Sequence, residues 1–130
     1  MAEKPKSYKD LLIWQKRMTM VTLIYQLTRS FPQDERFGLV VQMRRAAVSV
    51  PSNIAEGQSR HTSGEFIQFI SHAEGSLAEL DTQVLIAIEL GFCTQPQADG
   101  ILSVIDESQR MLNGLRQKLA TRHSPLATHA

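Results

Sequence analysis

The chain has 130 residues, of which 42% are hydrophobic, and this length suits a single domain that buries its own core. Its one cysteine, Cys93, excludes an intrachain disulfide and fits a reducing compartment. The N-terminus is polar and no apolar run approaches the about 20 residues of a membrane span, so we expect a soluble, cytoplasmic protein with no membrane partner.

The formal net charge of +1 hides an uneven distribution of charge along the chain. Residues 1–60 hold ten Lys/Arg against five Asp/Glu, a balance of +5, whereas residues 61–120 hold three against eight, a balance of −5. A polarised chain of this kind can present a basic face to a partner. It can equally neutralise itself by pairing its two halves within the fold or between subunits, and both interpretations stay open here.

A first helix is predicted over residues 10–29, after a polar segment at 1–9. Its apolar residues form two stripes with the three-and-four spacing of a helix face. The stripes are Leu11, Trp14, Met18, Val21 and Tyr25, and Met20, Ile24, Leu27 and Phe31. Two stripes give more apolar surface than one side of a small bundle needs, so we expect another subunit to cover the surplus. The place of Trp14 and Tyr25 on a stripe favours a core position over a base-stacking role.

A second helix is predicted from residue 35 to residue 57, with Pro32 ending the first helix and Asp34 capping the second. Its buried stripe is expected to be Val40, Met43, Ala47, Val50 and Ile54. The Pro-Ser-Asn sequence at 51–53 resembles the turn of a helix-turn-helix motif. However, the apolar spacing passes Pro51 without a reset. We therefore predict one continuous helix with a kink at Pro51, where the missing N–H costs about 3 kcal/mol.

The third and fourth helices are predicted over residues 63–90 and 95–120. Thr62 or Ser63 is expected to cap the third helix, with Glu65 in its first turn and Gly91 just after its end. The expected stripe of the third helix is Phe66, Ile70, Ala73, Leu77, Leu80, Val84 and Ala87. That of the fourth keeps a heptad register through Ala98, Ile101, Ile105, Ser108, Leu112, Leu115 and Leu119. Residues 121–130 are expected to form a mobile tail.

Four amphipathic helices with short connections predict an all-α fold, an antiparallel up-down four-helix bundle with a proline-kinked second helix. The bundle is expected to form a single domain over residues 10–120. Neither an internal repeat nor a low-complexity linker interrupts it.

Catalytic chemistry has no recognisable motif in the sequence. There is no Walker-type phosphate loop and no Gly-x-Ser-x-Gly elbow, and Cys93 has no obvious activating partner. His61 and His72 are too far apart to form a metal pair on one helix face, and Glu-x-x-His does not occur. We therefore expect no catalytic residue, no metal site, no cofactor and no enzymatic activity.

Basic residues are the best candidates for a binding site, above all Lys16, Arg17, Arg44 and Arg45. Arginine suits phosphate because its planar fork can donate two hydrogen bonds at once. Arg44 and Arg45 point about 100° apart on a helix, so one is expected to meet solvent or phosphate while the other pairs with an acid, for example from the third helix. The competing interpretation is that these cations form salt bridges between helices or between subunits.

Asn53, Glu56 and Arg60 share a helix face beyond Pro51 and form a second candidate site. Asn53 and Arg60 would contact the nucleic acid or partner. The alternative is a solvated stripe in which Glu56 and Arg60 pair at i,i+4, an interaction that is worth only about 0.3–0.5 kcal/mol.

Three stretches carry a resemblance to a known family: DLLIWQK (10–16), IYQLTRSFPQDERFGLVVQMRRAAVSVPSNIAEGQSR (24–60) and GSLAELDTQV (75–84). Over residues 8–120 the chain resembles the bacterial four-helix-bundle family named for the 23S ribosomal RNA intervening-sequence protein. The resemblance implies a four-helix bundle and a ring of five subunits. More distantly, the chain is similar to accessory proteins of diversity-generating retroelements, which associate with a reverse transcriptase and bind nucleic acid.

Together these observations favour a non-enzymatic oligomeric scaffold, pentameric if the resemblance holds for assembly. We expect it to bind RNA, DNA or a nucleic-acid-processing protein through a basic face. The alternative is an oligomeric protein–protein interaction module with no nucleic-acid role.

Overall fold

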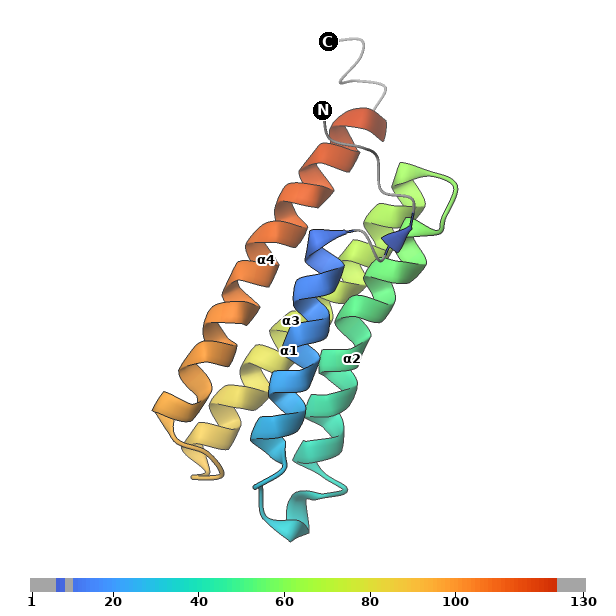
Figure 1. The fold of residues 1–130 in the computed structure, drawn as a ribbon. Coiled ribbons are helices and arrows are strands. Elements are labelled where there is room, and N and C mark those ends of the chain that lie inside the picture. Colours follow the sequence, from blue (N-terminus) through green and yellow to red (C-terminus); the bar gives the residue numbers. More distant parts are fainter. Residues whose placement is uncertain (1–6, 9–10, 124–130) are drawn as a thin grey trace.

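A computed structural model describes residues 7–8 and 11–123, and the side chains of residues up to 121. It contains the helices α1 (Leu12–Thr28), α2 (Leu39–Gln58), α3 (Ser63–Glu89) and α4 (Gln95–His123), with a short 3-10 helix, η2 (Gln33–Glu35), between α1 and α2 (Figure 1). The predicted all-α architecture of four helices is confirmed. Helix α4 continues to His123, so the helical domain extends three residues into the predicted tail, whose remainder lies outside the described residues.

Each long helix packs lengthwise against two others. Helix α2 contacts α1 and α3, and α4 contacts the same two helices from the opposite side. The α1–α2 and α3–α4 connections lie together at one end of the bundle, and the α2–α3 connection lies at the other end (Figure 1). This arrangement places residues 28–40, which run from the end of α1 through η2 to the start of α2, at one tip of the molecule.

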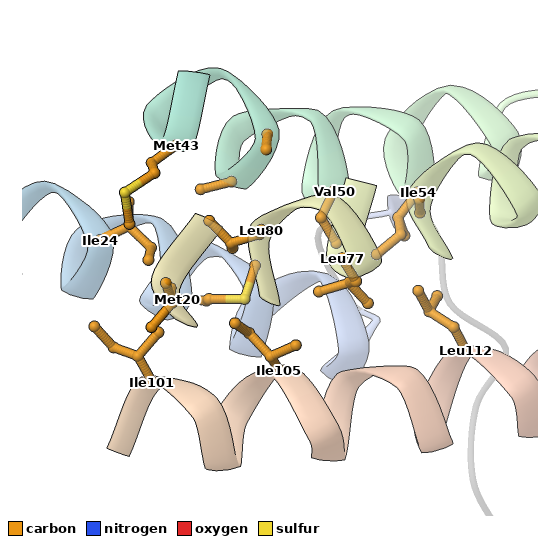
Figure 2. Packing of buried hydrophobic residues seen from close by; sticks show 14 of the residues in the cluster. Met20, Ile24, Met43, Val50, Ile54, Leu77, Leu80, Ile101, Ile105 and Leu112 are labelled. Carbon is orange, nitrogen blue, oxygen red and sulfur yellow. The ribbon is translucent and has the colours of Figure 1, made fainter. Parts of the chain in front are cut away.

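The core lies between all four helices and is built from the predicted stripes of α2, α3 and α4 together with Met20 and Ile24 of α1 (Figure 2). All residues of the α2 and α3 stripes are buried, and in the α4 stripe all are buried except Leu115, which is partly exposed. Burying each large aliphatic side chain contributes about 1.5–3 kcal/mol, which makes this core the main source of stability.

Helix α1 differs because only one side of it faces the bundle. In one stripe Met20, Ile24 and Phe31 are buried and Leu27 is partly buried, whereas Met18 and Tyr25 of the other stripe are 43% and 38% exposed. The predicted surplus of apolar surface is therefore present on α1. The expectation that Tyr25 belongs to the core is wrong, since Tyr25 lies on the exposed side of α1. Trp14 is half-buried and lies edge-on to Tyr8, with ring centroids 5.4 Å apart.

Helix α2 runs without interruption through Pro51, which is buried inside it. This continuity rules out the helix-turn-helix interpretation, whereas the kink at Pro51 stays a prediction. The start of the helix also differs from the expectation: α2 begins at Leu39, because Gln33–Glu35 form η2. The exposed Asp34 does not cap it; instead Glu35 Oε1 accepts a hydrogen bond from the Leu39 N–H at 3.3 Å.

The ends of α3 follow the sequence signals. Thr62 Oγ1 accepts the Glu65 N–H at 3.1 Å and donates to the Glu65 carboxylate at 3.0 Å, so Thr62 is the predicted N-cap. At the other end Gly91 has φ of 76°, and the Phe92 N–H reaches the Ala87 carbonyl at 2.9 Å. This is the Schellman geometry that the glycine permits. Among the described residues, no helix is long and apolar enough to span a membrane.

Gly57 allows the end of α2 to approach the start of α3 closely. A Cβ atom at this position would lie 2.6 Å from Phe66 Cδ1 and 2.9 Å from Phe69 Cβ. Real Cβ atoms do not approach other atoms so closely, so the packing at this corner requires glycine.

Candidate nucleic-acid interface

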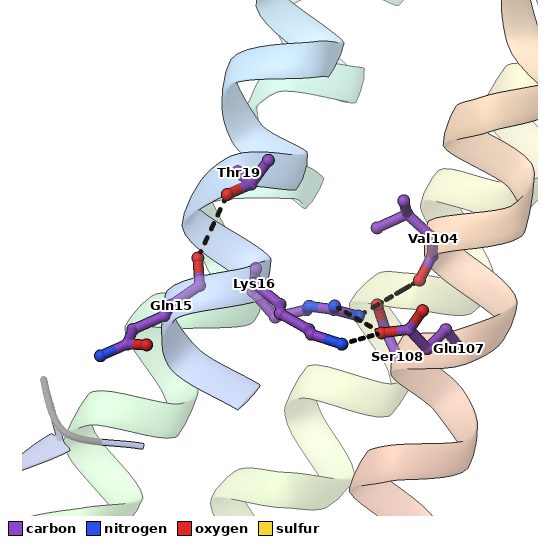
Figure 3. A network of polar contacts seen from close by, with 7 residues as sticks. Gln15, Lys16, Thr19, Val104, Glu107 and Ser108 are labelled. Carbon is purple, nitrogen blue, oxygen red and sulfur yellow. Dashed lines mark hydrogen bonds and ion pairs between the residues drawn. The ribbon is translucent and has the colours of Figure 1, made fainter. Parts of the chain in front are cut away.

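Two of the predicted binding residues, Lys16 and Arg17, hold α1 against α4 (Figure 3). Lys16 Nζ donates to Glu107 Oε1 at 2.9 Å, and Arg17 Nη1 donates to the Val104 carbonyl at 3.2 Å. Arg17 is 1% exposed, and its Nη2 lies 3.8 Å from the same Glu107 oxygen. These contacts turn both cations towards a carboxylate of their own chain, and burial keeps Arg17 from meeting a large ligand.

We call the contact of Lys16 and Arg17 with Glu107 the α1–α4 seam. The same contacts explain the shifted pKa values of Glu107 and Arg17. The hydrogen bond from Lys16, followed by the charge of Lys16, lowers the pKa of Glu107 below its ordinary value. Burial lowers the pKa of the Arg17 guanidinium, and the charge of Glu107 opposes that shift. Because an arginine titrates far above neutrality, Arg17 remains charged, and the seam is a half-buried ion-pair cluster.

Asn53 and Arg60 also make contacts within the chain. The Asn53 amide donates to the Ser49 carbonyl at 2.8 Å, and the Ser49 hydroxyl in turn lies 2.8 Å from the Ser76 hydroxyl on α3. Arg60 pairs with Glu56 at 3.8 Å, which is the i,i+4 pair of the alternative interpretation. Its guanidinium also lies over the Phe69 ring at 4.7 Å. This face therefore connects α2 to α3 through its polar groups.

Arg44 and Arg45 have no carboxylate partner in the described part of the chain, so the expectation that one of them pairs with an acid of α3 is wrong within the subunit. Arg44 Nε donates to Thr28 Oγ1 at 2.9 Å, and its guanidinium carbon lies 4.4 Å from the centroid of the Tyr25 ring. The buried Thr28 hydroxyl is itself fixed by donating to the Ile24 carbonyl at 2.8 Å. Arg45 is exposed.

The structure adds two arginines that the sequence interpretation missed, Arg29 and Arg36. With Arg44 they line a pocket of about 190 Å³ at the tip formed by the α1–α2 connection. Helical periodicity could not reveal this group, because its members lie on both sides of a chain reversal. The sequence signal that could have revealed the group is the high density of arginine: residues 29–45 contain four arginines and only two acids, Asp34 and Glu35.

In the described part of the chain, the Lys and Arg side chains without a carboxylate partner are concentrated at this end of the bundle. Five other Lys and Arg side chains in this part of the chain are in ion pairs: Lys16, Arg17, Arg60, Arg110 and Arg116. Those without a carboxylate partner are Arg29, Arg36, Arg44, Arg45 and Lys118. Four of these five lie between residues 29 and 45. We call Arg29, Arg36, Arg44 and Arg45 the arginine surface.

An apolar groove between α1 and α2 leads to the arginine surface. It consists of two adjoining hollows of about 360 and 540 Å³ that share Val48. Trp14 and Met18 line the first hollow, whereas Arg44 and Arg45 line the second. Separate exposed apolar residues lie at the C-terminal end of α3: Leu85, Ile86 and the C-cap residue Leu90. We call these two regions the α1–α2 groove and the α3 patch.

Cys93 and the possible metal ligands were the candidates for catalytic chemistry in the described part of the chain. Cys93 is buried, and burial raises the pKa of its thiol, which disfavours the reactive thiolate. Within the same residues no three His, Cys, Asp or Glu side chains come together in a way that would hold a metal ion.

These features define a small helical-bundle protein with a basic tip and an uncovered apolar groove. The chain belongs to the family of the 23S rRNA-intervening sequence protein, whose model matches residues 9–114. This confirms the family resemblance, and the match ends within α4.

A solved structure from Bacteroides thetaiotaomicron shares the fold. It is described as a protein with unknown function from the S23 ribosomal protein family. The likeness has a TM-score of 0.73 and covers 81% of this chain and 98% of that one, at 18% sequence identity. Comparison with curated proteins gives no match.

Proposed function

We propose that this protein is a non-enzymatic, oligomeric helical-bundle scaffold that binds nucleic acid, or a nucleic-acid-processing protein, through the arginine surface. The observation that carries the proposal is the position of the cations without carboxylate partners, four of which lie between residues 29 and 45. Their donors are available to phosphate without first breaking an internal ion pair. Arginine is also the residue whose donor geometry matches phosphate best.

Assembly into a ring is the second part of the proposal. A ring requires two different surfaces on each subunit, because its contacts run head to tail. The α1–α2 groove and the α3 patch supply two such surfaces, with Met18 and Val48 on one and Leu85 on the other each at least 40% exposed. The number of subunits that we propose, five, comes from the family resemblance.

The mechanism would be charge complementarity repeated around a rigid assembly. Each subunit would contribute one arginine surface of modest affinity, and a strand that reaches several copies would gain avidity without any new type of contact. Most of the affinity would be electrostatic, so it should weaken steeply with salt.

The α1–α2 groove favours a second candidate function, an oligomeric protein–protein interaction module with no nucleic-acid role. Its exposed apolar residues include Val41 and Tyr25. In that case the arginines would border an interface with an acidic protein. The two candidates differ in whether purified protein binds nucleic acid near physiological salt.

Binding of single- and double-stranded RNA and DNA to purified, nuclease-treated protein tests the proposal. The variant Arg29→Gln/Arg45→Gln removes two charges from the arginine surface, and both side chains are exposed and lie outside the ion pairs of the described residues. Arg110→Gln/Lys118→Gln removes the same charge from α4 as a matched control. We expect the first variant to weaken binding about tenfold and the control to change it little. No binding by the wild type near physiological salt, or an equal loss in both variants, would refute the nucleic-acid role.

A further inference from the structure

The pocket at the tip of the bundle brings together three arginines from the two sides of a chain reversal. Arg29 follows the end of α1, Arg36 follows η2, and Arg44 lies in the second turn of α2. Together with Thr28 and Gln33 they line a pocket of about 190 Å³, and Phe31, Pro32 and Val40 supply its apolar part. Arg45 is not among the lining residues, although it belongs to the same basic surface.

One arginine of the pocket is held in place before any ligand arrives. Arg44 is fixed through its Nε by Thr28 Oγ1 at 2.9 Å and through its guanidinium face by the Tyr25 ring at 4.4 Å. These contacts use the face and one N–H, so the remaining N–H groups keep their capacity to donate. A donor that is already ordered loses less entropy when a ligand binds.

The positive charge of the pocket is not balanced by its own lining. Asp34 and Glu35 are the acids of the connecting segment, and neither lines the pocket. Glu35 uses its Oε1 to accept the Leu39 N–H, and Asp34 is exposed to solvent. Three arginines line the pocket and no carboxylate does, so a bound anion would offset the repulsion between their charges.

We infer that this pocket binds a phosphate monoester, and, resting on the proposed function, that the phosphate is the terminal phosphate of a nucleic-acid strand. A monoester carries a charge of about −1.5 to −2 and three acceptor oxygens, which suits three arginines better than the single charge of a carboxylate. An internal phosphodiester also carries one charge, and both of its sugar substituents would have to leave the pocket. The pocket volume of about 190 Å³ is about six times the roughly 30 Å³ that one water molecule occupies in the liquid. This is enough for a phosphate group and its ester oxygen.

Inorganic phosphate tests the pocket without nucleic acid. We expect a millimolar phosphate series to raise the Tm of the wild type by about 3 °C or more, relative to chloride at the same ionic strength. Arg36→Gln should abolish this shift, because it removes one wall of the pocket. Arg45→Gln should retain it, although it removes the same charge from the same end of the molecule. Absence of the shift in the wild type, or an equal shift in both variants, would overturn the inference.

Oligonucleotides test the source of the phosphate. A single strand with a 5′ or 3′ terminal phosphate should bind the wild type about tenfold more tightly than the same strand with hydroxyl ends. Arg36→Gln should remove the preference, whereas Arg45→Gln should weaken all strands and keep it. If phosphate stabilises the wild type but no strand end is preferred, the assignment to a strand end is wrong.

The two proposals fail in different ways. Binding of nucleic acid without a phosphate-dependent shift in Tm would refute the pocket and leave the scaffold function intact. A phosphate-dependent shift without binding of any nucleic acid would refute both the nucleic-acid role of the scaffold and the assignment to a strand end, and the phosphate site would remain.

Discussion

Arg44 on α2 lies over the ring of Tyr25 on α1, with its guanidinium carbon 4.4 Å from the ring centroid. Thr28, one turn further along α1, accepts a hydrogen bond from the same side chain. An arginine without a carboxylate partner is therefore ordered by an aromatic face and a hydroxyl. This arrangement keeps its full charge available and makes Tyr25 a positioning residue for the arginine surface.

Replacing Tyr25 should weaken nucleic-acid binding without removing any charge. Tyr25→Leu loses the cation–π contact, worth about 0.5–1 kcal/mol, so we expect a two- to fivefold loss of affinity, about the factor that this energy implies. Tyr25→Phe keeps the ring face and should bind like the wild type. Titration of a labelled strand measures both variants, and equal affinities for Leu and Phe would show that the ring does not position Arg44.

Gly57→Ala should destabilise the bundle although alanine favours helices. The new Cβ would overlap Phe66 Cδ1, 2.6 Å away, and overpacking of this kind costs about 1–3 kcal/mol. Gly75→Ala on α3 is the matched control, because nothing lies within 4 Å of its Cβ position. There we expect a gain of about 0.5–1 kcal/mol from helix propensity. Urea unfolding of both variants gives the comparison, and changes of the same sign would contradict the packing argument.

The α1–α4 seam should make stability depend on pH in the acid range. The pKa of Glu107 is lowered in the folded state, chiefly by the hydrogen bond from Lys16. A carboxyl with a lowered folded pKa stabilises the fold above its unfolded pKa, and this contribution is lost as the pH falls through the folded value. We therefore expect the free energy of unfolding to fall as the pH drops below about 4.5, the ordinary value for this group.

Urea denaturation between neutral and strongly acid pH measures this contribution. Both Glu107→Gln and Lys16→Gln should flatten the acid part of the profile, since one removes the carboxyl and the other removes the main cause of its shift. A Lys16→Gln profile with the full acid dependence of the wild type would show that the pair does not produce it.

Val48→Glu should disrupt the oligomer, because Val48 belongs to both hollows of the α1–α2 groove. The new carboxylate would have to lose its water at an apolar subunit contact, and this desolvation is costly even with Arg44 and Arg45 in the same hollow, so we expect a shift towards the 14.6 kDa mass of one chain. Phe37→Glu is the control, since Phe37 is 84% exposed and does not line the groove. Light scattering after size exclusion reports the masses, and a monomeric wild type would refute the assembly.

Much of the fold could be predicted because helix periodicity and capping are local signals. The stripe from Val40 to Ile54 identified one helix through Pro51, and Thr62 and Gly91 marked the ends of α3. The start of α2 was harder to predict, since Asp34 is a residue type that often caps a helix but lies in η2 instead. The preference for a 3-10 turn here depends on how the chain passes from α1 to α2, which no local pattern encodes.

The candidate site was predicted only in part, because the partner of a charged side chain depends on tertiary structure. Arg17 and Arg44 are equally basic in the sequence, yet α4 brings Glu107 to Arg17 while α1 brings Tyr25 and Thr28 to Arg44. Arg29 and Arg36 joined the site only through the reversal of the chain between α1 and α2. The pair Arg60–Glu56 was predictable because it lies within one helix.

The salt dependence of nucleic-acid binding tests the central claim most directly, that the arginine surface contacts phosphate. The slope of log Kobs against log salt counts the phosphates that the protein neutralises, at about 0.7–0.9 for each. We predict that Arg29→Gln/Arg45→Gln reduces the magnitude of this slope by about 1.4–1.8 for each engaged subunit, while Arg110→Gln/Lys118→Gln leaves it unchanged. An unchanged slope in the first variant would contradict the claim.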